Sequence, residues 1–164
     1  MSKSLDLACE VVNTLKKKNK FITTVESCTG GGLSNIITNI SGASEVITSA
    51  RVTYSNNEKV RLGVSQKLIE EFTVYSTEIA KAMAKVGIQN AEKADIGVGI
   101  TGSISRIDPN NPNSKPGEVY IAVEYGDIVI SDKFIFSDEG ERCEVKDKAI
   151  IKALRMVLNV LNDA

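Results

Sequence analysis

The sequence predicts a three-layer α/β/α sandwich built on a mixed central sheet. Segments rich in β-branched residues alternate with amphipathic segments through the first hundred residues, and a β-hairpin follows near the end of the chain. Strands joined by helices pair in parallel, whereas a hairpin adds antiparallel strands, so we expect a mixed sheet. The chain has 164 residues and no linker-like stretch, so residues 1–164 are expected to form a single domain.

The first segments predict a helix, a strand and a second helix. Apolar residues recur at helical spacing over residues 5–15, with Ser4 as the expected cap and Asn19 as the expected stop. Residues 21–25 are β-branched and aromatic, which is typical of a buried strand. A glycine-rich turn follows, and helical spacing resumes over residues 33–40.

The middle of the chain predicts one strand and three helices. The strand falls within the β-prone residues 45–53, and a short helix capped by Ser55 or Asn56 comes next. A second short helix is expected over residues 65–72 and a longer one over residues 77–92.

The last third predicts the remaining strands and a closing helix. Residues 95–102 form an apolar strand of small residues, and residues 103–116 form a long irregular loop with three prolines. Residues 118–125 and 128–136 form the hairpin around a Gly-Asp turn. Apolar residues at helical spacing over 145–161 predict a helix that packs on the sheet.

The composition excludes several kinds of chemistry. The chain has no histidine, which rules out a Ser-His-Asp triad, a Cys-His dyad and a His-ligated zinc. Its three cysteines, Cys9, Cys28 and Cys143, are far apart, so we expect a reducing, cytoplasmic setting without a structural metal. The formal net charge of −1 and the lack of a long apolar stretch argue against nucleic-acid or membrane partners and against a signal peptide.

Three polar clusters follow the expected parallel strands, at residues 26–31, 54–59 and 99–102. Ligands of open α/β sheets bind beyond the carboxyl ends of the strands, so these clusters are expected to form one site. Arg142 and Lys146, one helical turn apart, are expected to face a phosphate, although they are also compatible with an ordinary charged helix start.

The first cluster places Ser27 at a strand-to-helix corner. The backbone N–H groups from Cys28 to Gly31 would lie at the positive end of a helix, where they could bind an anion or an oxyanion. Gly30 and Gly31 would allow a ligand to approach the backbone closely. The simpler interpretation is that Thr29 and its neighbours only cap a helix.

The second cluster supplies a base for Ser27. Without histidine a serine nucleophile needs another base, and Lys59 qualifies if burial near a helix N-terminus lowers its pKa. Tyr54 would relay a proton or orient the amine. Two alternatives remain open, namely that Lys59 is a surface lysine and that Cys28 is the nucleophile. In the third cluster, Thr101 and Gly102 would form a wall of the pocket.

These motifs together resemble those of the CinA carboxy-terminal domain family over nearly the whole chain. Residues 24–31, with the sequence TVESCTGG, resemble its signature, and residues 52–56 with Lys59 resemble its second motif. Residues 99–102 and the Gly-Glu-Arg of residues 140–142 are similar to its third and last motifs.

The resemblance implies an α/β/α fold and hydrolysis of the carboxamide of nicotinamide mononucleotide to nicotinic acid mononucleotide and ammonia. By similarity, Ser27 is the nucleophile, Lys59 the general base and Tyr54 their partner, with no metal and no cofactor. Further substrate contacts are expected at Glu26, Cys28, Thr29, Gly30, Gly31, Thr101, Gly102 and Arg142. We expect a cytoplasmic homodimer that acts on this small nucleotide. The extra amino-terminal domain of larger family members is expected to be absent.

Two departures from the family pattern affect the expected substrate. Residues 103–106, Ser-Ile-Ser-Arg, replace a proline and glycine-rich stretch, and a polar insertion precedes Gly140. Both lie where the substrate is expected, away from Ser27 and Lys59. Two alternative functions therefore stand beside the first, namely an amidase with the same mechanism but a different amide, and a module that binds a nucleotide without catalysis.

Overall fold

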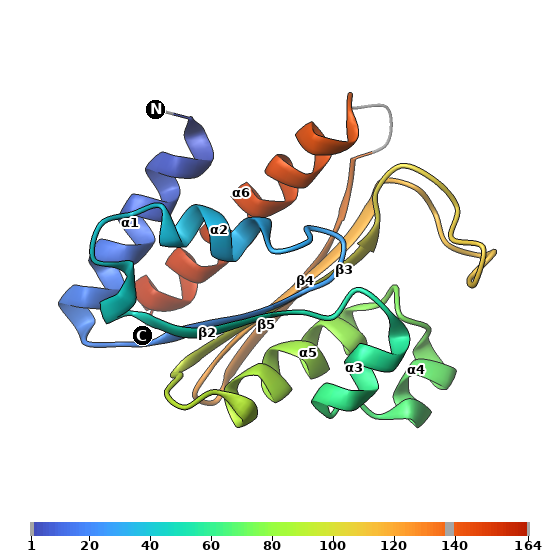
Figure 1. Ribbon diagram of the computed structural model, residues 1–164, viewed down its shortest axis with the longest axis horizontal. Helices are drawn as coiled ribbons and strands as arrows, with labels where there is room; N and C mark the ends of the chain where they lie inside the picture. The colour runs from blue at the N-terminus through green and yellow to red at the C-terminus, as the bar shows by residue number, and fades with distance from the viewer. Residues whose placement is uncertain (1, 137–139, 164) are drawn as a thin grey trace.

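One five-stranded sheet lies between two layers of helices in the computed structural model of the protein (Figure 1). The structure describes residues 2–136 and 140–163. The elements, in chain order, are α1 Lys3–Lys18, β1 Ile22–Glu26, α2 Gly32–Thr38, the 3₁₀ turn η1 Ala43–Glu45, β2 Ile47–Val52, α3 Asn56–Leu62, α4 Gln66–Phe72, α5 Thr77–Asn90, β3 Ile96–Ser103, β4 Glu118–Tyr125, β5 Ile128–Ile135 and α6 Arg142–Asp163.

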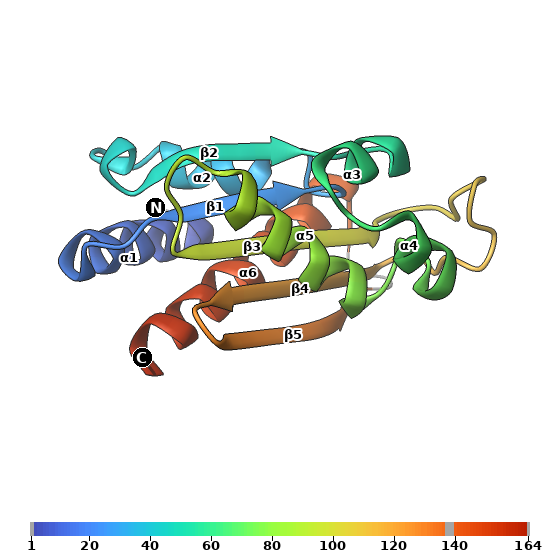
Figure 2. The ribbon, with the colours of Figure 1, turned by 90° about the horizontal axis from the view of Figure 1, so that it is seen from below.

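The strand order is β2-β1-β3-β4-β5 (Figure 2). Strand β1 pairs in parallel with β2 and β3, whereas β4 pairs antiparallel with β3 and β5. The predicted mixed sheet and α/β/α sandwich are thus confirmed. The carboxyl ends of β1, β2 and β3 lie at one edge, where α3 and α4 also gather (Figure 2).

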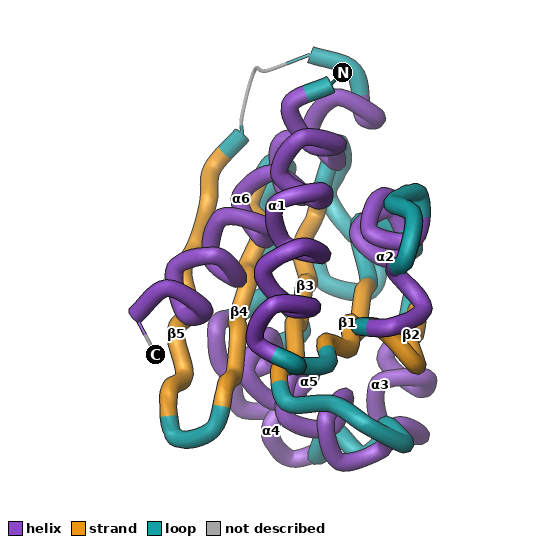
Figure 3. Tube along the Cα trace, turned by 90° about the vertical axis from the view of Figure 1, so that its left-hand side faces the viewer, coloured by secondary structure: helices purple, strands orange, loops and turns teal. Residues whose placement is uncertain are grey.

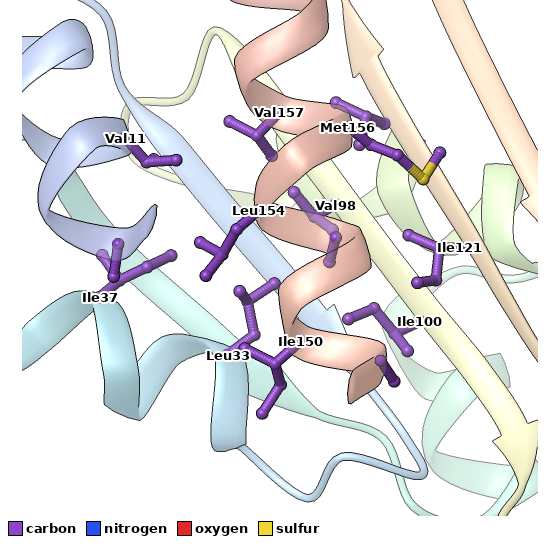
Figure 4. Packing of buried hydrophobic residues seen from close by; sticks show 14 of the residues in the cluster. Val11, Leu33, Ile37, Val98, Ile100, Ile121, Ile150, Leu154, Met156 and Val157 are labelled. Carbon is purple, nitrogen blue, oxygen red and sulfur yellow. The ribbon is translucent and has the colours of Figure 1, made fainter. Parts of the chain in front are cut away.

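The two helical layers bury different faces of the sheet. Helices α1, α2 and α6 cover one face, and α3, α4 and α5 lie on the other (Figures 1 and 3). In the first layer, side chains of α2 and α6 such as Leu33 and Leu154 pack toward Ile100 of β3 (Figure 4). In the second layer, Val25 of β1 packs with Met83 of α5.

Several predicted boundaries need correction. Ser2 caps α1 by accepting the Leu5 N–H at 3.3 Å, whereas Ser4 is buried inside the helix. The β-prone segment 45–53 starts with η1, so β2 is shorter than its composition suggests. Short-range propensity cannot resolve these ends, because the strand begins only where its neighbour β1 offers hydrogen bonds.

Two segments outside the regular elements bear on the site. The long loop between β3 and β4 is closed on itself by a β-bridge between Asp108 and Asn111. The polar insertion expected before Gly140 lies outside the described residues. No helix within residues 2–136 and 140–163 combines the length and apolar character that spanning a membrane requires.

Helix α5 packs directly on the backbone of β3, which contains Gly97 and Gly99. A Cβ atom at Gly99 would collide with the Ala80 carbonyl oxygen and would lie 2.8 Å from the Ala84 nitrogen. Both neighbours are backbone atoms of a helix, so they cannot rotate away. The absence of a side chain at Gly99 therefore sets the distance between α5 and the sheet.

Replacing Gly99 by alanine is expected to lower the free energy of unfolding by about 3 kcal/mol, because the helix must move off the sheet. Urea denaturation measures the loss. Gly126→Ala is the matched control, because Gly126 has no atom within 4 Å of the added methyl and only a positive φ of 58°. That control should cost about 1 kcal/mol. Equal losses in the two variants would contradict the close-packing argument.

Candidate active site

A cavity of about 640 Å³ opens at the carboxyl ends of β1, β2 and β3. All three polar clusters that the sequence placed at these strand ends contribute to it. The walls also include the start of α6, the loop after β3 and the connection between α4 and α5. The lining residues that concern the chemistry are Ser27, Cys28, Tyr54, Lys59, Tyr75, Gly102, Arg106, Asp108 and Arg142.

At the centre of the site, the Lys59 amine meets the Ser27 hydroxyl. Ser27 follows β1 directly, and its N–H donates to the Ile100 carbonyl at 2.9 Å, which anchors the corner to β3. Lys59 Nζ donates to Ser27 Oγ at 3.1 Å and to the Thr53 carbonyl at 2.8 Å. The expected pairing of Ser27 with a lysine is therefore present in the geometry.

Burial sets the charge state of Lys59. The side chain is only 2% exposed although it sits on a short surface helix, α3. Removal from water disfavours the ammonium form and lowers the pKa of Lys59 to about 8. Nearby anionic groups, Asp108 among them, oppose this shift. A substantial fraction of Lys59 is thus a neutral amine near physiological pH, as a base for Ser27 must be.

The Cys28 thiol is less suited to act as the nucleophile. It is buried, and burial raises its pKa to about 12, so the reactive thiolate is rare at neutral pH. The Lys59 amine donates its hydrogen bond to the neighbouring Ser27 hydroxyl. These observations favour the serine of the two neighbouring candidates.

Glu26 lies beneath the cavity and does not line it. The side chain is fully buried, and its carboxylate accepts hydrogen bonds from Thr29 Oγ1 at 2.6 Å and from the N–H groups of Leu33 and Ser34 at 2.9 Å. Glu26 therefore caps the N-terminus of α2, where the sequence suggested a site for a ligand's anion. Thr29, also fully buried, holds this cap in place.

The turn before α2 still offers hydrogen-bond donors beside Ser27. Gly30 N–H donates to the Ser27 carbonyl at 3.0 Å, which closes the turn, and both Gly30 and Gly31 have positive φ. Among the described residues, the Thr29 N–H donates to no other residue, whereas the Cys28 N–H hydrogen-bonds the Cys28 sulfur. Of this segment only Ser27 and Cys28 line the cavity.

Tyr54 contacts Arg142, and the structure gives it no hydrogen bond to Ser27 or Lys59 in the described part of the chain. Its side chain is 63% exposed, and its hydroxyl accepts from Arg142 Nη2 at 3.1 Å. Arg142 Nη1 donates to Ser105 Oγ at 2.9 Å. Arg142 lines the cavity, and a Cβ at Gly30 would lie 3.4 Å from the Lys146 amine, so Lys146 lies close to the turn before α2.

Thr101 acts from behind the cavity wall. It is fully buried, and its hydroxyl donates to the Val74 carbonyl at 2.7 Å, whereas Gly102 lines the cavity itself. The hydrogen bond ties the end of β3 to the segment before α5. Thr101 thus positions a wall and does not face a ligand.

Two lining residues were not predicted from the sequence. Tyr75 donates a hydrogen bond to the Asp108 carboxylate at 2.7 Å, and both side chains border the cavity. They are separated by 33 positions. The only signal in the sequence was the unusual length of the loop that contains Asp108.

The family can be assigned by comparison with known proteins. The model of the CinA C-terminal domain family matches residues 4–161. The chain belongs to the CinA C-terminal domain family. This assignment agrees with the fold, since the structure of a competence/damage inducible protein from Agrobacterium tumefaciens superposes with a TM-score of 0.87 at 28% identity, covering 99% of this chain and 97% of the other.

Relatives of two lengths share this CinA domain. A nicotinamide-nucleotide amidohydrolase, PncC, of Pseudomonas putida is 35% identical, with 94% of each chain covered. A CinA-like protein of Flavobacterium psychrophilum is 37% identical over 93% of this chain, and a putative competence-damage inducible protein of Caldicellulosiruptor saccharolyticus is 40% identical over 88%. The chain spans only about a third of these two longer relatives, 36% and 34% respectively.

The burial of Lys59 predicts a pH-dependent stability. Its pKa is about 8 in the folded state and about 10.5 when unfolded, so the unfolded chain holds one more proton between these values. The free energy of unfolding should therefore rise with pH through this window, by roughly 2 kcal/mol from this group.

Urea denaturation at pH 7.5 and pH 10 should show the rise in the native chain and its loss in Lys59→Met. The control is Lys85→Met, a matched change at an exposed position of α5, which should keep the rise. An unchanged rise in Lys59→Met would contradict the buried amine.

Proposed function

We propose that this chain is a nicotinamide-nucleotide amidohydrolase that releases ammonia from nicotinamide mononucleotide through a Ser27 nucleophile and a Lys59 base. The observation that supports this most directly is the hydrogen bond between the buried Lys59 amine and Ser27 Oγ, 3.1 Å long, at the floor of a cavity large enough for a nucleotide. The full-length similarity to a relative named nicotinamide-nucleotide amidohydrolase supports the substrate.

The first half of the reaction forms an acyl-enzyme. The neutral Lys59 amine accepts the Ser27 proton while Oγ attacks the carboxamide carbon. Negative charge develops on the carboxamide oxygen, and the backbone N–H groups of Cys28 and Thr29 are the donors that follow the nucleophile directly in the chain. Such a donor is typically worth about 3–4 kcal/mol in the transition state. The Lys59 ammonium then returns its proton to the departing nitrogen, and ammonia leaves as the C–N bond breaks.

The second half of the reaction hydrolyses this ester. Lys59 is neutral again after ammonia has left, and it accepts a proton from a water molecule that attacks the acyl carbon. The bond to Ser27 Oγ breaks, Oγ takes the proton back, and nicotinic acid mononucleotide is released. Every proton transfer in this scheme passes through Lys59, so Tyr54 has no proton-transfer role. Its hydroxyl instead orients Arg142.

The basic end of α6 is suited to the phosphate of the substrate. Arg142 lines the cavity with its guanidinium fixed by Tyr54 and Ser105, and Lys146 follows one helical turn later beside Gly30. A guanidinium held in this way binds phosphate with two parallel hydrogen bonds. This role replaces the α2 N-terminus, which Glu26 already occupies.

An amidase with the same mechanism but a different amide is the second candidate. The cavity contains Tyr75 and Asp108, and Asp108 belongs to the loop that departs from the family pattern. A module that only binds a nucleotide is less well supported, because a buried lysine with a lowered pKa that contacts a serine is typical of a reactive site.

Ammonia release from nicotinamide mononucleotide, measured with a chelator present, tests the proposal. The native chain should release ammonia, and Ser27→Ala should reduce turnover at least about 1,000-fold because no nucleophile remains. Ser131→Ala, a matched change on β5, should keep the native rate. Activity retained in Ser27→Ala but lost in Cys28→Ala would make the thiol the nucleophile. Release from nicotinamide or its riboside but not from the nucleotide would favour the second candidate.

The reaction rate should depend on the protonation of Lys59. Since only the neutral amine accepts the Ser27 proton, kcat/KM should rise about tenfold per pH unit below pH 8 and level off above it. Lys59→Met should be nearly inactive at every pH. Recovery of the variant at alkaline pH would show that hydroxide or another group replaces the lysine as base, and a flat native profile would contradict the assigned pKa.

A further inference from the structure

The cavity wall contains a carboxylate without a counterion. Among the residues that the structure describes, the charged side chains that line the cavity are Lys59, Arg106, Arg142 and one acid, Asp108. Asp108 accepts hydrogen bonds from the Tyr75 hydroxyl at 2.7 Å and from the Asn110 N–H at 2.9 Å. Within residues 2–136 and 140–163 it forms no ion pair with any lysine or arginine. Its negative charge is therefore available to a ligand.

Two separate parts of the chain fix the position of this carboxylate. Its own loop is closed by the Asp108 N–H, which donates to Ser114 Oγ at 2.8 Å, and by Asn111 N–H, which donates to the Asp108 carbonyl at 2.9 Å. Tyr75 reaches it from the connection between α4 and α5. Burial and the neighbouring carboxylate raise the pKa of Tyr75, so its hydroxyl stays protonated and keeps donating. A carboxylate held by two separate segments has a fixed position in the cavity wall.

The charge distribution of the cavity is that of a site for a zwitterion. Arg142 provides positive charge at the start of α6, with Lys146 beside Gly30. The loop after β3 provides the negative charge of Asp108, with Arg106 two positions before it. Asp108 also acts on Lys59 electrostatically, which places it near the reacting groups. A ligand with a phosphate at one end and a cation close to its amide would satisfy both groups.

We propose that Asp108 and the ring of Tyr75 recognise the positively charged pyridinium ring of the substrate, so that the site selects pyridinium carboxamides over neutral amides of the same shape. This inference rests on the proposed function. An aromatic face next to an anion is a favourable environment for a delocalised cation. The carboxylate also offsets the second positive charge that appears when Lys59 takes the Ser27 proton next to that ring. Asp108 is then a specificity residue and Tyr75 both a ring contact and its positioning partner.

Binding to the Ser27→Ala protein tests the inference without turnover. Calorimetry would compare nicotinamide mononucleotide with its 1,4-dihydro form, which has the same ribose, phosphate and carboxamide but a neutral ring. Asp108→Asn should weaken binding of the cationic compound about tenfold and leave the neutral one within about twofold, because only the charge contact is lost. Tyr75→Phe, which keeps the ring but frees the carboxylate, should give a smaller loss in the same direction. Asp127→Asn, the same change in the exposed β4–β5 turn, should alter neither constant.

Three outcomes would overturn the inference. Equal weakening of both compounds by Asp108→Asn would mean that the carboxylate contacts the ribose or only supports its loop. No change in either constant would remove Asp108 from the binding site. The third outcome, failure of the Ser27→Ala protein to bind either compound, would refute the proposed function as well. The first two outcomes would refute only the role of Asp108.

Discussion

The arrangement of the site depends on one buried amine. A lysine on a helix of seven residues would ordinarily extend into water, yet Lys59 is withdrawn from solvent and donates to Thr53 and Ser27. This geometry requires α3 to follow β2 without a long connection, because Thr53 and Lys59 must lie together at the same edge of the sheet as Ser27. The cost of withdrawing an ammonium group from water is what lowers the pKa of Lys59.

A second ionisable group, Glu26, is also withdrawn from water, but the protein stabilises its charge in a different way. Its carboxylate is satisfied by the Thr29 hydroxyl and by two N–H groups at the start of α2, so it needs neither solvent nor a cation. The result is a rigid turn between β1 and α2. Ser27 and Cys28 are the residues of that turn left facing the cavity. One buried group therefore has a lowered pKa, and the other makes the turn after β1 rigid.

The Ser27–Lys59 pair and the walls of the cavity come from different parts of the chain. Ser27 directly follows β1 and is tied to β3 by its N–H, and Lys59 reaches it from α3. The walls come from the loop after β3, the connection before α5 and the start of α6. Such segments can change without disturbing the sheet. This division agrees with a family that shares one fold at 28% sequence identity while its members carry several names.

The sequence by itself determined the order of helices and strands and the mixed sheet, and it brought the segments with Ser27 and Lys59 to one edge of that sheet. Those features follow from short-range patterns and from the rule that parallel strands end at one edge of a sheet. Only the tertiary structure decided which way each side chain points. It turned Glu26 and Thr101 inward and joined Tyr75 to Asp108 across 33 positions. No local pattern encodes these contacts, because each depends on the packing of elements that are distant in the chain.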